Sequence, residues 1–141
     1  MIKIYSLKKD GELSLSKNFK VKEFRCKDGS DTIKIDTELV TMLQKIRDIV
    51  GVPVKINSAY RTPSYNAKVG GAKNSYHTKG QACDIVCSGK TPLDIAKIAE
   101  SLGMRGIIKY NTFTHVDTRP TKYYSINKNG AVTKCTTFNN K

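Results

Sequence analysis

Apolar residues between Asp36 and Val50 recur at the spacing of one helix face. They follow a period of about 3.6 residues and are Leu39, Met42, Leu43, Ile46, Ile49 and Val50. Asp36 or Thr37 can cap the first turn, and Gly51 can end the helix. This pattern predicts an amphipathic helix over 36–50.

Two further helices are predicted from Thr-Pro pairs at 62–63 and 91–92. In each pair the threonine supplies a capping hydroxyl and the proline suits the first helical turn. The first helix should run through Val69 and end at Gly70-Gly71. The second should bury its apolar side and stop at Gly103.

Short runs rich in β-branched residues predict strands at 52–57, 81–87, 106–110, 113–118, 123–126 and 131–137. Asn129-Gly130 is a strong hairpin turn, Asn111-Thr112 is a weaker one, and 70–80 should be a loop. Residues 1–30 show no decisive pattern. The expected fold class is α+β, with a small, mostly antiparallel sheet covered by helices.

The chain has 141 residues, of which 38% are hydrophobic, and it has no repeat or linker. We therefore expect one domain over 1–141 and a monomer. No apolar run of about 18 residues could cross a bilayer, and the start of the sequence lacks the apolar core of a signal peptide. We expect no membrane association.

The formal net charge of +13 favours polyanionic surroundings, such as nucleic acid or anionic wall polymers. The lysines are scattered and accompany no nucleic-acid-binding motif, so we do not expect nucleic acid as a partner. The four cysteines form no CxxC pair and are expected to be free thiols, although a disulfide between Cys26 and Cys135 stays open.

Both histidines of the chain lie in segments that carry a carboxylate. His77 precedes Asp84 by seven residues, and Gly80 permits the bend that would aim both side chains at one point. His115, on a later strand, could add a third ligand. Two imidazoles and one carboxylate leave the fourth position of a zinc ion free, which suits hydrolysis better than structural bracing.

The strand around His115 places further side chains near the same point. Phe113, His115 and Asp117 project from one face, whereas Val116 turns toward the core. Asp117 should therefore point toward the metal side.

Residues Ser75, His77, Gly80, Ala82 and Asp84 form the pattern SxHxxGxAxD, and 58–61 reads SAYR, close to SxYR. In these motifs the chain resembles the zinc D-Ala-D-Ala metallopeptidase family, which has a Hedgehog-like zinc fold. The resemblance covers about 36–119, and 120–141 would form a C-terminal hairpin or tail.

The resemblance implies Zn²⁺ held by His77, Asp84 and His115. It also implies that Arg61 polarises the scissile carbonyl or grips a substrate carboxylate, which suits a planar guanidinium. Three further residues are candidates for binding substrate: Tyr60, Ser75 and Gln81. For Ser75 and Gln81, a role in supporting the loop is equally open.

The implied function is hydrolysis of peptide bonds next to D-alanine in peptidoglycan stem peptides, as a D,D-carboxypeptidase or an endopeptidase. The enzyme would act at the bacterial cell wall, released as a phage-type lysin or exported by a trimmed signal.

One departure from the family pattern concerns the general base. Relatives carry it two or three residues before the last ligand, where this chain has Phe113 and Thr112. Asp117 is the candidate base, and a role in orienting a ligand histidine is the alternative. The missing family base also leaves open a catalytically weak, zinc-containing module that binds the cell wall.

Overall fold

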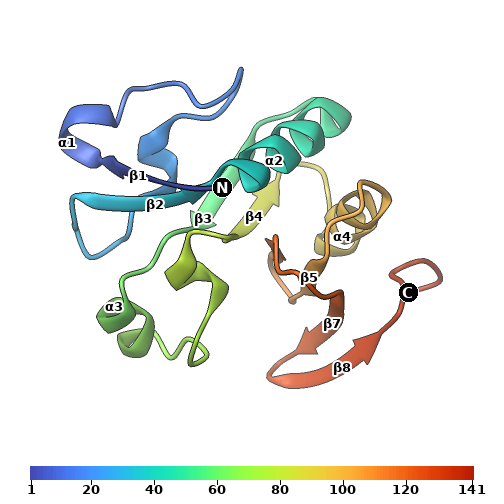
Figure 1. The fold of residues 1–141 in the computed structure, drawn as a ribbon. Coiled ribbons are helices and arrows are strands. Elements are labelled where there is room, and N and C mark those ends of the chain that lie inside the picture. The colour runs from blue at the N-terminus through green and yellow to red at the C-terminus, as the bar shows by residue number, and fades with distance from the viewer.

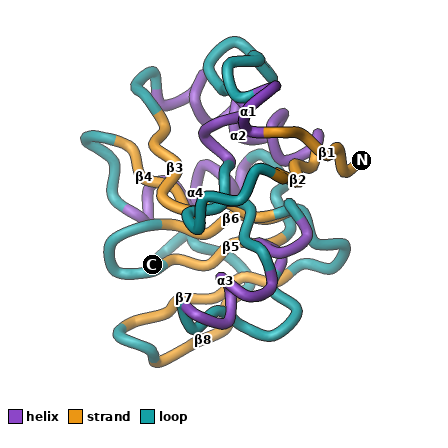
Figure 2. Tube along the Cα trace, turned by 90° about the vertical axis from the view of Figure 1, so that its left-hand side faces the viewer, coloured by secondary structure: helices purple, strands orange, loops and turns teal.

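A six-stranded sheet forms the centre of the molecule in the computed structural model, which describes residues 1–141. Its order is β3-β4-β6-β5-β7-β8 (Figure 2). The strands are β3 (Val54–Ser58), β4 (Ala82–Cys87), β5 (Gly106–Lys109), β6 (Thr114–Asp117), β7 (Tyr123–Lys128) and β8 (Ala131–Cys135). All neighbours pair antiparallel except β5 and β7, so the expected α+β class with a mostly antiparallel sheet is confirmed.

Both predicted hairpins, β5–β6 and β7–β8, are present. The parallel pairing of β5 with β7 was not predicted. Of the two neighbours of β6, β4 already pairs with β3 on its outer edge, whereas the outer edge of β5 is free, and β7 pairs there. The chain reverses between β5 and β6 and again between β6 and β7, so β7 runs in the same direction as β5.

Two helices cover one face of this sheet. Helix α4 (Pro92–Ser101) packs on β4, β5 and β6, and α2 (Thr37–Val50) packs beside α4 and on β3 (Figure 1). The predicted cap of α2 is confirmed, because the Asp36 carboxylate accepts a hydrogen bond from the Glu38 backbone N–H. Gly51 ends the helix with φ of 70°, a conformation that favours glycine.

The core lies between these helices and the sheet. Ile85, Ile107 and Val116 point into it from three neighbouring strands and are fully buried. Residues that alternate with them on the same strands must face the opposite side. The opposite face of the sheet is therefore where β4 presents Asp84 and β6 presents His115 and Asp117.

The N-terminal region forms a second, two-stranded sheet. Antiparallel strands β1 (Ile2–Ser6) and β2 (Thr32–Asp36) enclose α1 (Leu7–Asp10) and a 3₁₀ turn, η1 (Val21–Phe24). Buried side chains from this region, among them Phe19, join the main core. The second sheet is thus part of one hydrophobic unit with the large sheet.

The segment that carries the first histidine lies on the open face of the sheet. Helix α3 (Pro63–Lys68) is followed by a 3₁₀ turn, η2 (Tyr76–Lys79), in the region expected to be a loop (Figure 1). The expectation was incomplete because a 3₁₀ turn this short has no apolar period to read.

All four cysteines are free thiols, as predicted. No helix is both long and apolar enough to cross a membrane.

Candidate metal centre

His77 is held rigidly at the start of η2. The Ser75 hydroxyl accepts a hydrogen bond from the His77 backbone N–H, and Gly80 ends the turn with φ of 76°. The His77 ring is buried, and its Nδ1 lies 2.7 Å from the carbonyl oxygen of Ala59. Because a carbonyl only accepts hydrogen bonds, Nδ1 carries a proton, and Nε2, which faces Asp84, is the nitrogen that could bind a metal.

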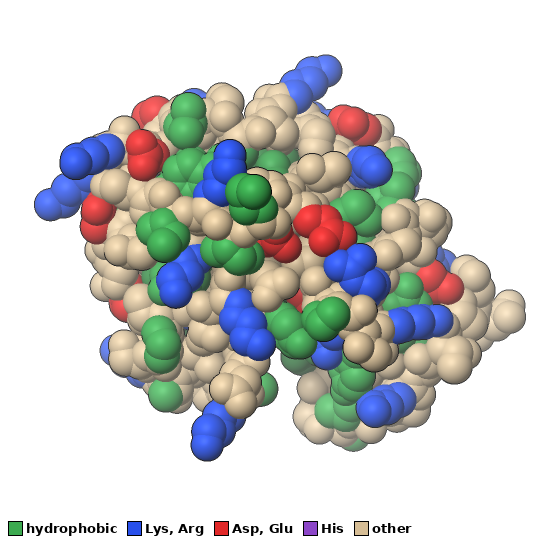
Figure 3. Space-filling model, in the orientation of Figure 1, with side chains coloured by type: hydrophobic (Ala, Val, Ile, Leu, Met, Phe, Trp, Pro, Cys, Tyr) green, Lys and Arg blue, Asp and Glu red, His purple; other side chains and the backbone are tan.

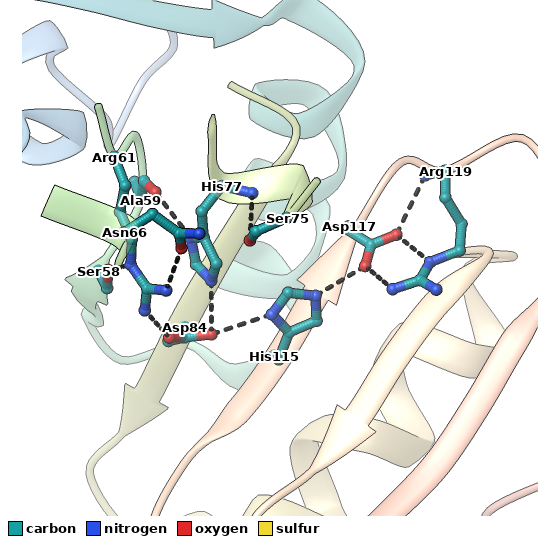
Figure 4. A network of polar contacts seen from close by, with 10 residues as sticks. All are labelled: Ser58, Ala59, Arg61, Asn66, Ser75, His77, Asp84, His115, Asp117 and Arg119. Atoms are coloured by element: carbon teal, nitrogen blue, oxygen red, sulfur yellow. Dashed lines mark hydrogen bonds and ion pairs between the residues drawn. The ribbon is translucent and has the colours of Figure 1, made fainter. Parts of the chain in front are cut away.

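Asp84 and His115 face each other across neighbouring strands, β4 and β6. The Asp84 Oδ1 atom lies 3.2 Å from His77 Nε2 and 3.1 Å from His115 Nδ1. Figure 4 shows the carboxylate of Asp84 between the two imidazole rings. The bend at Gly80 and the strand pairing therefore bring together the three residues that were predicted from the sequence as candidate metal ligands.

These three side chains could hold a metal ion. One ligand atom from each lies within 4.8 Å of the others, and all three residues are buried. Two nitrogens and one oxygen form the donor set of many catalytic zinc sites. The donor chemistry and the orientation of the rings therefore fit zinc.

Asp117 contacts the side of His115 that faces away from Asp84 (Figure 4). Its Oδ2 lies 2.7 Å from His115 Nε2, and both carboxylate oxygens accept hydrogen bonds from Arg119. The side chain of Asp117 is fully buried. This geometry favours the orienting role over the base role. Asp117 lies on the side of the His115 ring that is far from Asp84, and both of its oxygens already take part in hydrogen bonds, so neither is free for a water on the metal side.

The charges of this cluster shift the pKa of its members. Burial opposes protonation of His115, but hydrogen bonds to Asp117 and Asp84 outweigh it and raise the pKa of the imidazole to about 9. Burial would raise the pKa of Asp84, but hydrogen bonds from His115 and His77 hold it well below its usual range. Without a metal, a proton on His115 Nδ1 occupies the position of the cation.

Arg61 approaches the cluster from the end of β3. Its Nε donates to the Ser58 hydroxyl at 3.0 Å, and its Nη1 donates to Asn66 Oδ1 at 3.1 Å. Its Nη2 lies 3.4 Å from Asp84 Oδ2. The guanidinium is therefore fixed beside the three candidate metal ligands.

A cleft of about 430 Å³ opens over the three candidate ligands. The loop 69–76 forms one wall, and residues around β5 and β6, including Tyr110 and Phe113, form the other. The lining includes Arg61, Lys73 and Arg119, and Asp84 is the only carboxylate in it. Figure 3 shows the molecule notched between the α3 region and the β7–β8 hairpin, with basic side chains spread over this face.

The predicted substrate-binding residues separate into two groups. Ser75 lines the cleft while it caps η2. Tyr60 is buried in the hydrophobic core, and Gln81 donates to the Thr118 hydroxyl at 3.3 Å; neither lines the cleft. On extended backbone, neighbours of Arg61 and Ala82 point the opposite way, which explains why Tyr60 and Gln81 do not line the cleft.

The sequence analysis did not identify three residues that support the side chains around the candidate site: Asn66, Gly106 and Arg119. A Cβ atom on Gly106 would lie 1.7 Å from Asp117 Oδ1, so only glycine leaves room for that carboxylate. Asn66 is a buried polar residue inside α3, a position that periodicity marks only as helical. The spacing of Asp117 and Arg119, two apart on an extended segment, was the one available signal for their pairing.

Comparisons with known proteins show which family the chain is similar to. The family model described as Peptidase M15 matches residues 17–117. The peptidoglycan L,D-endopeptidase MepK of Escherichia coli K12 is 35% identical over 99 residues, which are 64% of this chain and 54% of that protein. The chain thus spans about half the length of this and the equivalent MepK relatives.

Two other relatives extend the comparison. The probable peptidoglycan L,D-endopeptidase MepK of Haemophilus influenzae is 34% identical over 129 residues, covering 79% of this chain and 69% of that protein. The zinc D-Ala-D-Ala carboxypeptidase of Streptomyces albus G is 35% identical over 86 residues, covering 55% of this chain and 34% of that protein. From the motifs, the cluster and the family match together, the chain belongs to the peptidase M15 family.

Proposed function

We propose that this chain is a zinc-dependent peptidase that hydrolyses stem peptides of bacterial peptidoglycan. The observation that carries the proposal is the buried trio of His77, Asp84 and His115 at the floor of an open cleft. Relatives named for peptidoglycan endopeptidase and zinc carboxypeptidase activity support the choice of substrate. The site of action would be the cell wall.

The three candidate ligands, Arg61 and Asp117 each have a part in this chemistry. Zinc held by the trio would polarise the scissile carbonyl and acidify a water molecule. Arg61 donates hydrogen bonds either to the developing oxyanion or to a substrate carboxylate. Asp117 holds His115 in the tautomer whose Nδ1 faces the metal position. Asp84 is the only carboxylate in the lining of the cleft, and as a candidate zinc ligand it would not be free to accept a proton from water.

The bond cut is proposed to lie next to D-alanine, in a carboxypeptidase or an endopeptidase reaction. Purified peptidoglycan fragments incubated with the protein and analysed by mass spectrometry would separate the two reactions. Release of free D-alanine indicates a carboxypeptidase, whereas cut cross-links indicate an endopeptidase. Chelator and the His77→Ala variant should each reduce turnover by at least about 100-fold. Product formation that resists both treatments would contradict zinc catalysis.

A wall-binding module with weak catalysis is the second candidate, favoured by the absence of a second carboxylate from the cleft. Such a module would sediment with purified walls and release little product at any zinc concentration. Zinc-dependent cleavage of many substrate molecules by each protein molecule would rule it out.

A further inference from the structure

Arg119 grips Asp117 through three hydrogen bonds. Its Nε donates to Oδ1 at 2.8 Å, its Nη2 donates to Oδ2 at 2.6 Å, and its backbone N–H donates to Oδ1 at 3.1 Å. The two side-chain bonds form a bidentate fork, which fixes the plane of a carboxylate as well as its position. Burial alone would raise the pKa of Asp117, but the Arg119 hydrogen bonds outweigh it and keep the pKa low.

Arg119 also contacts two aromatic rings. Its guanidinium carbon lies 4.7 Å from the ring centre of Tyr76 and 4.7 Å from that of Tyr123. Tyr76 directly precedes His77 in η2, and Tyr123 is the first residue of β7. Cation–π contacts of this kind restrain a guanidinium that would otherwise sample several rotamers.

These contacts link Arg119 to both histidines. Through Asp117 it acts on Nε2 of His115, and through Tyr76 it packs against the turn that carries His77. Because Gly106 has no side chain, the Asp117 carboxylate lies close against the backbone of β5. The hydrogen bonds from Arg119 then fix the plane of that carboxylate. An ordinary surface ion pair would show neither a fully buried partner nor two aromatic supports.

We propose that Arg119 is a positioning residue that fixes both imidazole ligands of the metal centre, with Tyr76 and Tyr123 as its supports. The inference rests on the proposed zinc function. Arg119 acts on the metal only through Asp117 and Tyr76, and the fork, rather than the charge alone, is what the site requires.

The test compares zinc affinity in Arg119→Lys, Arg119→Gln and the wild type, measured by competition with a chromophoric chelator. Loss of a group that orients a ligand histidine weakens metal binding by about 10–100-fold. We expect Arg119→Gln to fall in this range and Arg119→Lys to lie between it and the wild type. Lys134→Gln is the matched control, because Lys134 lies 5.3 Å from the ring centre of Tyr123 and does not contact Asp117. Its zinc affinity should stay within about twofold of the wild type.

Circular dichroism of each variant would show that it is folded before the affinities are compared. Equal zinc affinity in the wild type and both Arg119 variants would overturn the positioning role and leave the proposed function intact. Equal losses in Arg119→Gln and Lys134→Gln would also overturn it, since that result assigns the effect to net charge. A wild-type chain that binds no zinc would instead overturn the proposed function and this inference together.

Discussion

His115 has two carboxylate partners because of its place on β6. Asp84 lies directly across on β4 and reaches Nδ1, whereas Asp117, two residues along the same strand, reaches Nε2. The alternation of a strand predicted that Asp117 shares the face of His115. It did not determine which ring nitrogen Asp117 contacts, because that depends on the ring orientation set by the neighbouring strand.

The first prediction at this scale separates the two roles of Asp117. In Asp117→Asn the amide retains the shape of the carboxylate but loses its charge, so it no longer fixes the proton on His115 Nε2. We expect zinc affinity to fall about 10–100-fold and turnover to recover in part at high zinc. Zinc titration and peptidoglycan digestion of the same variant measure both. Unchanged zinc affinity with lost turnover would point to the base role.

The second prediction concerns pH. The pKa of His115 is about 9 without a metal, and zinc must replace the proton on Nδ1. Below that pH, apparent zinc affinity should rise about tenfold for each unit of pH. Competition titrations at pH about 7 and about 8.5 would measure the slope. A flat affinity across that interval would show that no proton is displaced.

The same pKa predicts the stability of the metal-free protein. The folded value of about 9 lies above the ordinary value of 6.5, so protonated His115 stabilises the fold below pH 6.5. That stabilisation is lost as the pH rises through the folded pKa. Thermal unfolding with chelator present should therefore show Tm decreasing from pH 6.5 to 9. A Tm that rises across the interval would contradict this assignment.

At the scale of elements, helices α2 and α4 were predictable because their signals are local. Each combines an apolar period with a capping residue, and in both the cap is observed. Strands β1 and β2 were not predicted. Ile2 and Ile4 of β1 are 42% and 68% exposed, so their apolar character does not report burial. The pairing of β5 with β7 depends on strand order, which no local pattern encodes.

Strand β5 supports the site through its first residue. In Gly106→Ala the added Cβ would meet the Asp117 carboxylate, which cannot move without leaving Arg119 and His115. Overpacking of this kind costs about 1–3 kcal/mol in the free energy of unfolding. Zinc affinity should fall with it. Chemical denaturation and zinc titration measure the two effects.

Lys109→Ala is the control in the same strand, since Lys109 is partly exposed and does not contact Asp117. Its free energy of unfolding should stay within about 0.5 kcal/mol of the wild type. If Gly106→Ala behaved like Lys109→Ala, the close fit of Asp117 over Gly106 would not matter to the site.

At the scale of the whole molecule, the fold gives the sheet two different faces. Helices α2 and α4 bury one face, and the other presents Asp84 and His115 to a cleft walled by the 69–76 loop. The net charge of +13 is spread over the surface, and the cleft itself carries three basic side chains. A cationic surface of this kind favours approach to an anionic cell wall. The sequence predicted the three candidate ligands, but it did not predict the cleft walls, which come from segments far apart in the chain.

The central claim is that His77, Asp84 and His115 together hold one zinc ion. Crystals grown with zinc, and measured at the zinc absorption edge, test it most directly. We expect one anomalous peak about 2.0–2.2 Å from His77 Nε2, an Asp84 carboxylate oxygen and His115 Nδ1, with His115 Nε2 still bonded to Asp117. No peak between these three residues, or zinc bound through His115 Nε2, would contradict the account.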